Sequence, residues 1–102
     1  MQPEIFDLFE EAIRNGASDL ILKAGSPPVY KINHHMIISE KEKLASQQMY
    51  NMLLPILDAD QQENLQQNFK TASVFTLNRT LTRIRSFIYK QRGVYGGAFR
   101  FA

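Results

Sequence analysis

The chain has 102 residues, of which 44% are hydrophobic and 22% charged, with a formal net charge of +2. These values predict one ordinary soluble domain over residues 1–102 and exclude an intrinsically disordered chain. The absence of cysteine excludes disulfide frameworks and thiolate metal sites. Because no apolar run approaches the ~20 residues that span a bilayer, we expect no direct insertion into a membrane and no signal peptide.

The basic residues are unevenly distributed along the chain. The last quarter holds a cluster of them: Arg79, Arg83, Arg85, Lys90, Arg92 and Arg100. A positive region of this kind indicates a phosphate-bearing or acidic partner. The alternative is a solvated, charged sheet edge that prevents aggregation.

Residues 3–15 are predicted to form an amphipathic helix. Ile5, Leu8, Phe9, Ala12 and Ile13 recur with helical spacing as one apolar stripe. Asn15-Gly16 is typical of a helix end, because glycine adopts the left-handed conformation at little cost.

Short strands are expected next, at residues 19–23, 29–33 and 36–38, the last two joined by a tight turn. A helix then begins near residue 45 and ends or kinks at Pro55. Asp58 and Gln61 have the spacing of a capping box for a further helix, for which Leu65 and Phe69 are the predicted apolar anchors.

Three strands should follow, near residues 71–77, 81–91 and 94–101. Gly96-Gly97 indicates either a bulge or a close approach of the backbone. The order of elements predicts a segregated α+β fold, with a mostly antiparallel sheet and about three helices.

Several kinds of catalytic site are excluded by the sequence. It has no Gly-x-x-x-x-Gly-Lys-Ser/Thr loop, so residues 1–102 are not expected to be an enzyme by themselves. His34 and His35 are adjacent and would point to opposite faces of a strand, so no metal site is predicted.

The segment 83–93 carries the strongest chemical signal. In a strand, Arg83, Arg85, Phe87 and Tyr89 share one face, while Ile84, Ser86 and Ile88 share the other, the predicted core face. If this strand pairs with the next one, Arg85 and Arg100 could project toward one anion, and the rigid fork of arginine suits phosphate oxygens. Arginines paired with local acids are the alternative. A nucleic-acid surface is disfavoured by the small net charge.

Three segments of the sequence resemble one known family, the hexameric motors of type IV pili and type II secretion, in particular the pilus-retraction branch. Residues 16–28 are similar to its Ala-Ser-Asp-Leu-His-Leu segment and the Gly-x-Pro-Pro that follows. Residues 31–33 with their hairpin resemble the next part. Residues 83–93 with Phe99-Arg100 resemble its Arg-Phe-Arg-Val strand, Gln-Arg-Gly turn and returning strand. Ile21 departs from the pattern, because the family usually has histidine there, and His34 replaces the usual hairpin glycine region.

The resemblance implies that residues 1–102 are a PAS-like N-terminal domain, which a RecA-like ATPase domain follows in the family. It implies a cytoplasmic homo-hexamer at the bacterial inner membrane that drives pilus retraction (twitching motility) or secretion, with platform proteins as partners. ATP and Mg²⁺ would be cofactors of the full-length protein, and none is expected for this part alone. Arg85 and Arg100, and less strongly Arg83 and Arg92, match the arginines that reach the ATP phosphates. The alternative function is a free-standing PAS-like sensory or protein-interaction module.

Overall fold

The structure is a computed structural model that describes residues 4–102. The chain runs through α1 (Ile5–Arg14), β1 (Asp19–Lys23), β2 (Val29–Ile32), β3 (His35–Ile38), α2 (Ser46–Leu53), a 3₁₀ turn (Leu54–Ile56), α3 (Ala59–Asn68), β4 (Lys70–Leu77), β5 (Thr82–Gln91) and β6 (Val94–Phe101). The predicted helices and strands are confirmed in type and order. Pro3, the predicted helix start, lies outside the described residues.

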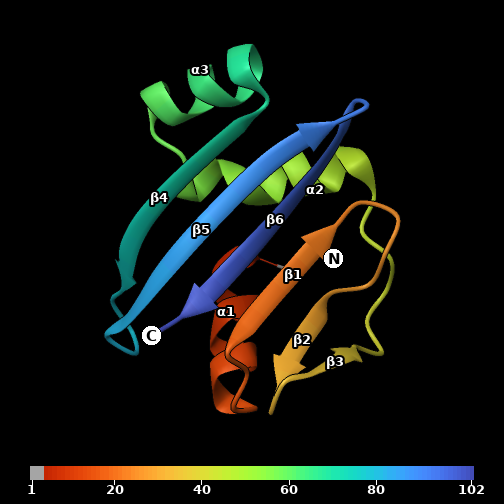
Figure 1. The fold of residues 1–102 in the computed structure, drawn as a ribbon, viewed down its shortest axis with the longest axis vertical. Coiled ribbons are helices and arrows are strands. Elements are labelled where there is room, and N and C mark those ends of the chain that lie inside the picture. The colour runs from red at the N-terminus through yellow and green to blue at the C-terminus, as the bar shows by residue number, and fades with distance from the viewer. Residues whose placement is uncertain (1–3) are drawn as a thin grey trace.

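The strands form one sheet in the order β3-β2-β1-β6-β5-β4, and every neighbouring pair is antiparallel (Figure 1). The α+β class is confirmed, and the PAS-like description fits the arrangement. The first strand, β1, and the last strand, β6, pair with each other in the middle of the sheet, so two segments from opposite ends of the sequence lie side by side.

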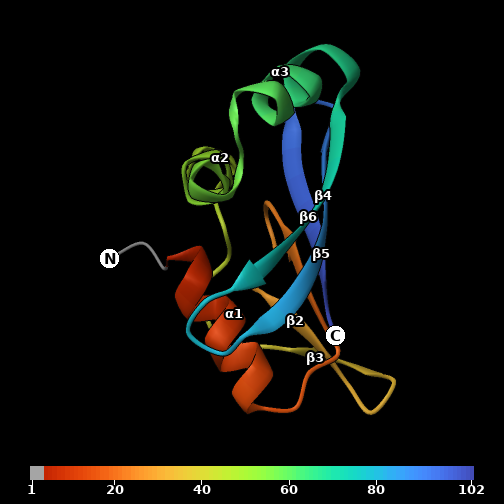
Figure 2. The same ribbon diagram turned by 90° about the vertical axis from the view of Figure 1, so that its left-hand side faces the viewer.

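All three helices cover the same face of the sheet, and the opposite face carries none (Figure 2). The apolar stripe of α1 packs inward, with Ile5, Leu8, Phe9 and Ala12 buried. Phe9 lies at the centre of an aromatic cluster, with its ring centroid 4.9 Å from that of Phe99. The sheet therefore has one core face and one face open to contacts with other molecules.

The helix ends follow the predicted chemistry. Gly16 has φ +77° after the end of α1, a conformation that glycine adopts without strain. At the start of α3 the carboxylate of Asp58 accepts a 2.8 Å hydrogen bond from the Gln61 amide, and the Gln61 side chain accepts a 2.9 Å bond from the Asp58 amide. The capping box is confirmed. Pro55 ends the preceding helix by turning it into a short 3₁₀ segment.

One sequence-based expectation was wrong, and one pair of alternatives is decided. Phe69 was expected to anchor α3 on the core, but it is 57% exposed, because its left-handed backbone (φ 63°) ends the helix and turns its ring outward. Leu65 is buried as predicted. Gly96-Gly97 form no bulge, since both pair in continuous register with β1 and β5. The other expectation, a close approach, is confirmed at Gly96, where a Cβ would lie 2.4 Å from the Tyr89 ring.

No helix in residues 4–102 is long and apolar enough to cross a bilayer.

Candidate functional site

The open face of the sheet presents the arginines that the sequence singles out. In β5 the even-numbered residues Ile84, Ser86 and Ile88 are buried against the helices. Arg83, Arg85 and Phe87 alternate with them and are exposed on the other face. The predicted division of this strand into a core face and an outer face is therefore confirmed.

Arg85 and Arg100 lie directly opposite each other on the antiparallel strands β5 and β6. Residues in this relation have Cβ atoms roughly 4.5–5.5 Å apart, and like charges so placed are destabilising. Both side chains are exposed, so solvent reduces the repulsion without removing it. An anion between the two guanidinium groups would relieve it.

Asp19 completes a row with the two arginines. It lies opposite Arg100 on β1, and its Oδ1 is 3.8 Å from the Nε of Arg100. The Ser18 hydroxyl donates a 2.6 Å hydrogen bond to the other carboxylate oxygen, Oδ2. No acidic group within residues 4–102 lies within 4.0 Å of Arg85 as an ion-pair partner. Pairing with a local acid, the alternative interpretation of these arginines, thus applies in part to Arg100. It does not apply to Arg85.

A shallow hollow of about 220 Å³ lies at this row. Asp19, Arg85 and Arg100 line one part of it, and Phe87 with Ala98 lines another. The hollow thus combines two guanidinium groups with an exposed aromatic ring, a combination that suits a phosphate-bearing ligand.

The other two candidate arginines lie apart from this pair to different degrees. Arg83 shares the face of Arg85 two residues earlier in β5, opposite Thr76 of β4. Arg92 lies in the β5–β6 turn with φ 54°, seven residues from Arg85. It lines a second hollow of about 410 Å³ with Lys23, Tyr89 and Tyr95. The fold therefore brings together Arg85, Arg100 and, at the margin, Arg83, while Arg92 lies at the far end of the hairpin.

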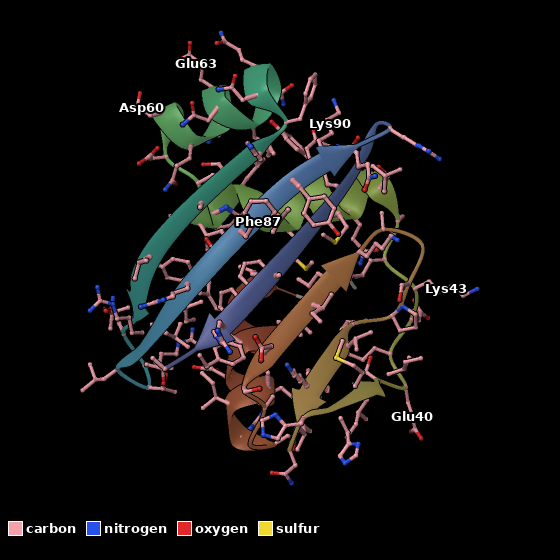
Figure 3. The ribbon with its side chains drawn as sticks, viewed as in Figure 1. Glu40, Lys43, Asp60, Glu63, Phe87 and Lys90 are labelled. Atoms are coloured by element: carbon pink, nitrogen blue, oxygen red, sulfur yellow. The ribbon has the colours of Figure 1, made fainter. Side chains whose placement is uncertain are left out.

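The acidic residues of the domain lie almost entirely outside its sheet. The outward positions of the strands carry Lys23, Lys31, Lys70, Arg83, Arg85 and Arg100, and Asp19 is the one acidic residue in the six described strands. Acidic side chains lie instead on the helices and loops, as Figure 3 shows for Asp60, Glu63 and Glu40. The open face is thus a positive surface. Among the described residues, no group of three His, Asp or Glu side chains could hold a metal ion.

Asp19 is the site residue that sequence reasoning missed. Its relation to Arg100 depends on the pairing of β1 with β6, residues that are about eighty positions apart in the chain. The strand sequence Asp-Leu-Ile-Leu-Lys does not alternate between polar and apolar residues, and the alternation of burial that places Asp19 on the outer face appears only in the structure.

No protein-family model matches the sequence, and no curated protein sequence matches it. The fold, however, is similar to solved structures. The pilus retraction motor PilT, solved with bound ADP, matches with a TM-score of 0.86 and 26% identity, over 96% of this chain and 29% of the PilT chain.

Two further structures share the fold at lower identity. The ATPase DotB of Legionella pneumophila matches with a TM-score of 0.76 and 14% identity, over 92% of this chain and 27% of its own. DotB of Yersinia pseudotuberculosis matches with a TM-score of 0.69 and 14% identity, over 94% and 29%. The chain thus spans less than a third of each of these proteins. The resemblance seen in the sequence is confirmed: the chain has the fold of one domain of the motor PilT and of the DotB ATPases, consistent with their N-terminal domain.

Proposed function

We propose that this chain is the mobile N-terminal domain of a hexameric ATPase that powers type IV pilus retraction or type II/IV secretion. In this proposal Arg85 and Arg100 contact the phosphates of ATP held by the ATPase domain. The observation that carries it is the direct opposition of these two arginines on the open face, with one acidic neighbour for the pair. The likeness to PilT, an ADP-binding motor at 26% identity, supports it.

The open face gives the domain a means of sensing nucleotide. Arginine–phosphate contacts would exist only when this face closes on the ATPase domain, so ATP would favour the closed arrangement by that difference in contacts. Bound Mg²⁺ would supply charge neutralisation of the phosphates. Loss of a phosphate after hydrolysis would weaken the contacts and release the domain. Packing of the domain on the neighbouring subunit would pass this movement around a cytoplasmic ring at the inner membrane, and from there to the platform proteins.

Arginine footprinting of the full-length motor tests the contact directly. The motor is treated with phenylglyoxal, with and without a non-hydrolysable ATP analogue, and modified arginines are quantified by mass spectrometry. We expect the analogue to protect Arg85 and Arg100, because their guanidinium groups would be covered. Arg14, exposed at the end of α1, is the matched control and should react equally in both samples. Equal modification of Arg85 and Arg100 with and without the analogue would overturn the proposal.

The reading frame beyond Ala102 provides an independent check. A Gly-x-x-x-x-Gly-Lys-Ser/Thr loop encoded downstream is expected for a motor. Its absence would favour the sensory or protein-interaction module instead.

A further inference from the structure

The open face of the sheet carries two aromatic rings beside the arginine pair. In β5 the outward positions run Arg85, Phe87, Tyr89, and the residues opposite them in β6 are Arg100, Ala98 and Gly96. Each ring therefore faces a small residue on the neighbouring strand. Phe87 is 45% exposed, and Figure 3 shows it on the side of the sheet away from the helices. A single exposed ring is ordinary at a protein surface, but apolar side chains that gather into a patch mark binding sites, and the partly exposed ring of Tyr89 lies beside that of Phe87.

Gly96 sets the position of the Tyr89 ring. A Cβ at residue 96 would lie 2.4 Å from Cζ and 2.5 Å from Oη of Tyr89, closer than real contacts allow. The ring therefore lies across the backbone of β6 in space that only glycine leaves open. The Phe87 ring is 6.0 Å from it, centroid to centroid, with the two planes inclined by 32°. Together Phe87 and Tyr89 form a stacking platform.

Positive charge surrounds the stacking platform. Lys70 lies opposite Tyr89 on β4, and Lys23 lies opposite Gly96 on β1, so an ammonium group flanks each side of this row. At the other end, the hollow of about 220 Å³ joins Phe87 to Arg85 and Arg100. With a rise of roughly 3.4 Å per residue, Arg85 lies about 7 Å from Phe87 and about 14 Å from Tyr89 along the strand. These separations suit a ligand with a flat ring at one end and phosphates at the other.

We propose that the stacking platform binds the base of a purine nucleoside polyphosphate whose phosphates reach Arg85 and Arg100. Aromatic side chains bind bases through their faces, and a purine offers the larger face. The site uses the arginine pair of the proposed function but needs no ATPase domain. The 102-residue chain should therefore bind a nucleotide by itself, which differs from the expectation that this part alone has no cofactor.

A nucleotide fits this face better than a single-stranded nucleic acid. The row that contains Phe87 continues across the sheet through Ala98, Ile21, Val29 and Ile38, which are apolar. The neighbouring row, through Arg85 and Arg100, is interrupted by Asp19 before it reaches Lys31. Further phosphates of a strand would therefore meet no continuous line of cations, on which nonspecific strand binding depends.

In the experiment, the 102-residue chain is titrated with ATP, sodium tripolyphosphate, adenosine and a dT₈ oligonucleotide. Binding is followed by the NMR chemical shifts of the backbone amides. ATP should bind at least about 5-fold more tightly than tripolyphosphate, since base stacking on an aromatic side chain contributes about 5- to 100-fold. The double variant Phe87→Thr/Tyr89→Thr should reduce ATP affinity to that of tripolyphosphate. Gly96→Ala should do so in part, by displacing the Tyr89 ring.

Phe69→Asn is the matched control, because it removes an exposed ring outside this face at a left-handed position that asparagine tolerates. It should bind ATP as the parent does.

Thermal unfolding of every variant verifies folding, and Gly96→Ala keeps the test valid if the double variant fails to fold. The proposal is overturned if ATP binds no better than tripolyphosphate or does not bind, if the platform variants bind ATP normally, or if dT₈ binds more tightly than ATP. Any of these results, together with footprinting protection of Arg85 in the full-length motor, would leave the proposed function standing without the stacking platform.

Discussion

The carboxylate of Asp19 lies 3.8 Å from the Nε of Arg100, which in turn stands opposite Arg85 on the next strand. Within residues 4–102, Asp19 is thus the one acidic group that competes with an external anion for this arginine pair. The Arg100 side chain is 70% exposed, so the ion pair contributes at most about 1 kcal/mol to stability.

Asp19→Asn should therefore tighten anion binding with little change in stability. Loss of a competing interaction worth roughly 0.2–1 kcal/mol corresponds to an increase in tripolyphosphate affinity of about 1.5- to 5-fold. NMR titration of the 102-residue chain at low salt measures it. Asp60→Asn on α3, in the helical layer, is the control for the change in net charge. Weaker or unchanged binding in Asp19→Asn, relative to that control, would show that Asp19 does not restrain Arg100.

The sequence predicted the local features of the fold and missed those that depend on long-range pairing. Alternation in β5 correctly assigned Ile84 to the core and Arg85 to the outer face, because a strand repeats every two residues. The Asp58 capping box could also be predicted from the sequence, because its contacts span only three residues. The pairing of β1 with β6 has no local signature, so the contact of Asp19 with Arg100 could not be foreseen. Phe69 was misassigned because its left-handed backbone breaks the helical period.

The β2–β3 turn should tolerate a stabilising change at His34. This residue has φ 67°, and the preceding Asn33 has φ 49°, as in the two-residue turns that favour Asn-Gly. His34→Gly should raise the free energy of unfolding by roughly 0.5–1 kcal/mol, because glycine adopts this conformation without steric cost. Urea unfolding measures the change. His35→Gly, at the start of β3, is the matched control and should lower stability instead, since glycine weakens a strand. Two changes of the same sign would contradict the turn assignment.

Tyr30 should make stability depend on alkaline pH. Burial raises the pKa of Tyr30 to about 12, and the nearby Glu11 carboxylate adds to the shift. Its hydroxyl has no hydrogen-bond partner among the described residues, despite the proximity of Glu11. Tyr30→Phe should therefore raise the free energy of unfolding by about 1 kcal/mol at pH 8.

The sign of the pH effect follows from the raised pKa. The folded state holds the Tyr30 proton more tightly than the unfolded state, whose pKa is about 10, so this stabilisation is complete below pH 10 and is lost as pH rises toward 12. Tyr30→Phe does not undergo this loss, so the difference in free energy of unfolding between Tyr30→Phe and the parent should widen above pH 10, by on the order of 1–3 kcal/mol at most. Urea unfolding at pH 8, 9.5 and 10.5 follows it. A constant difference across these pH values would show that Tyr30 titrates normally.

Leu8 should be a principal contributor to the packing of α1 on the sheet. It is 1% exposed, so Leu8→Ala removes buried methyl groups and leaves a cavity. We expect the free energy of unfolding to fall by ~2–5 kcal/mol. Ile13→Ala, on the partly buried margin of the same stripe, should cost less. Denaturant unfolding of both variants gives the comparison, and a loss below ~0.5 kcal/mol for Leu8→Ala would mean that the helix does not dock through this stripe.

The central claim is that Arg85 and Arg100 act on the phosphates of ATP, and steady-state ATPase kinetics of the full-length motor test it most directly. Arginines supplied to phosphoryl transfer contribute ~10³-fold or more in other systems. Here each alanine variant should lose less, because its partner arginine stays in place, and the loss should fall on the maximal rate more than on the KM for ATP. Lysine should rescue only in part, since a point charge cannot reproduce the bidentate fork.

Thermal unfolding on the same samples separates this role from a structural one. We predict that Arg85→Ala and Arg100→Ala each turn over ATP more slowly per folded hexamer without a large fall in melting temperature, while Arg14→Ala matches the parent in both. Normal turnover per folded hexamer in both alanine variants, with or without a lower melting temperature, would contradict it.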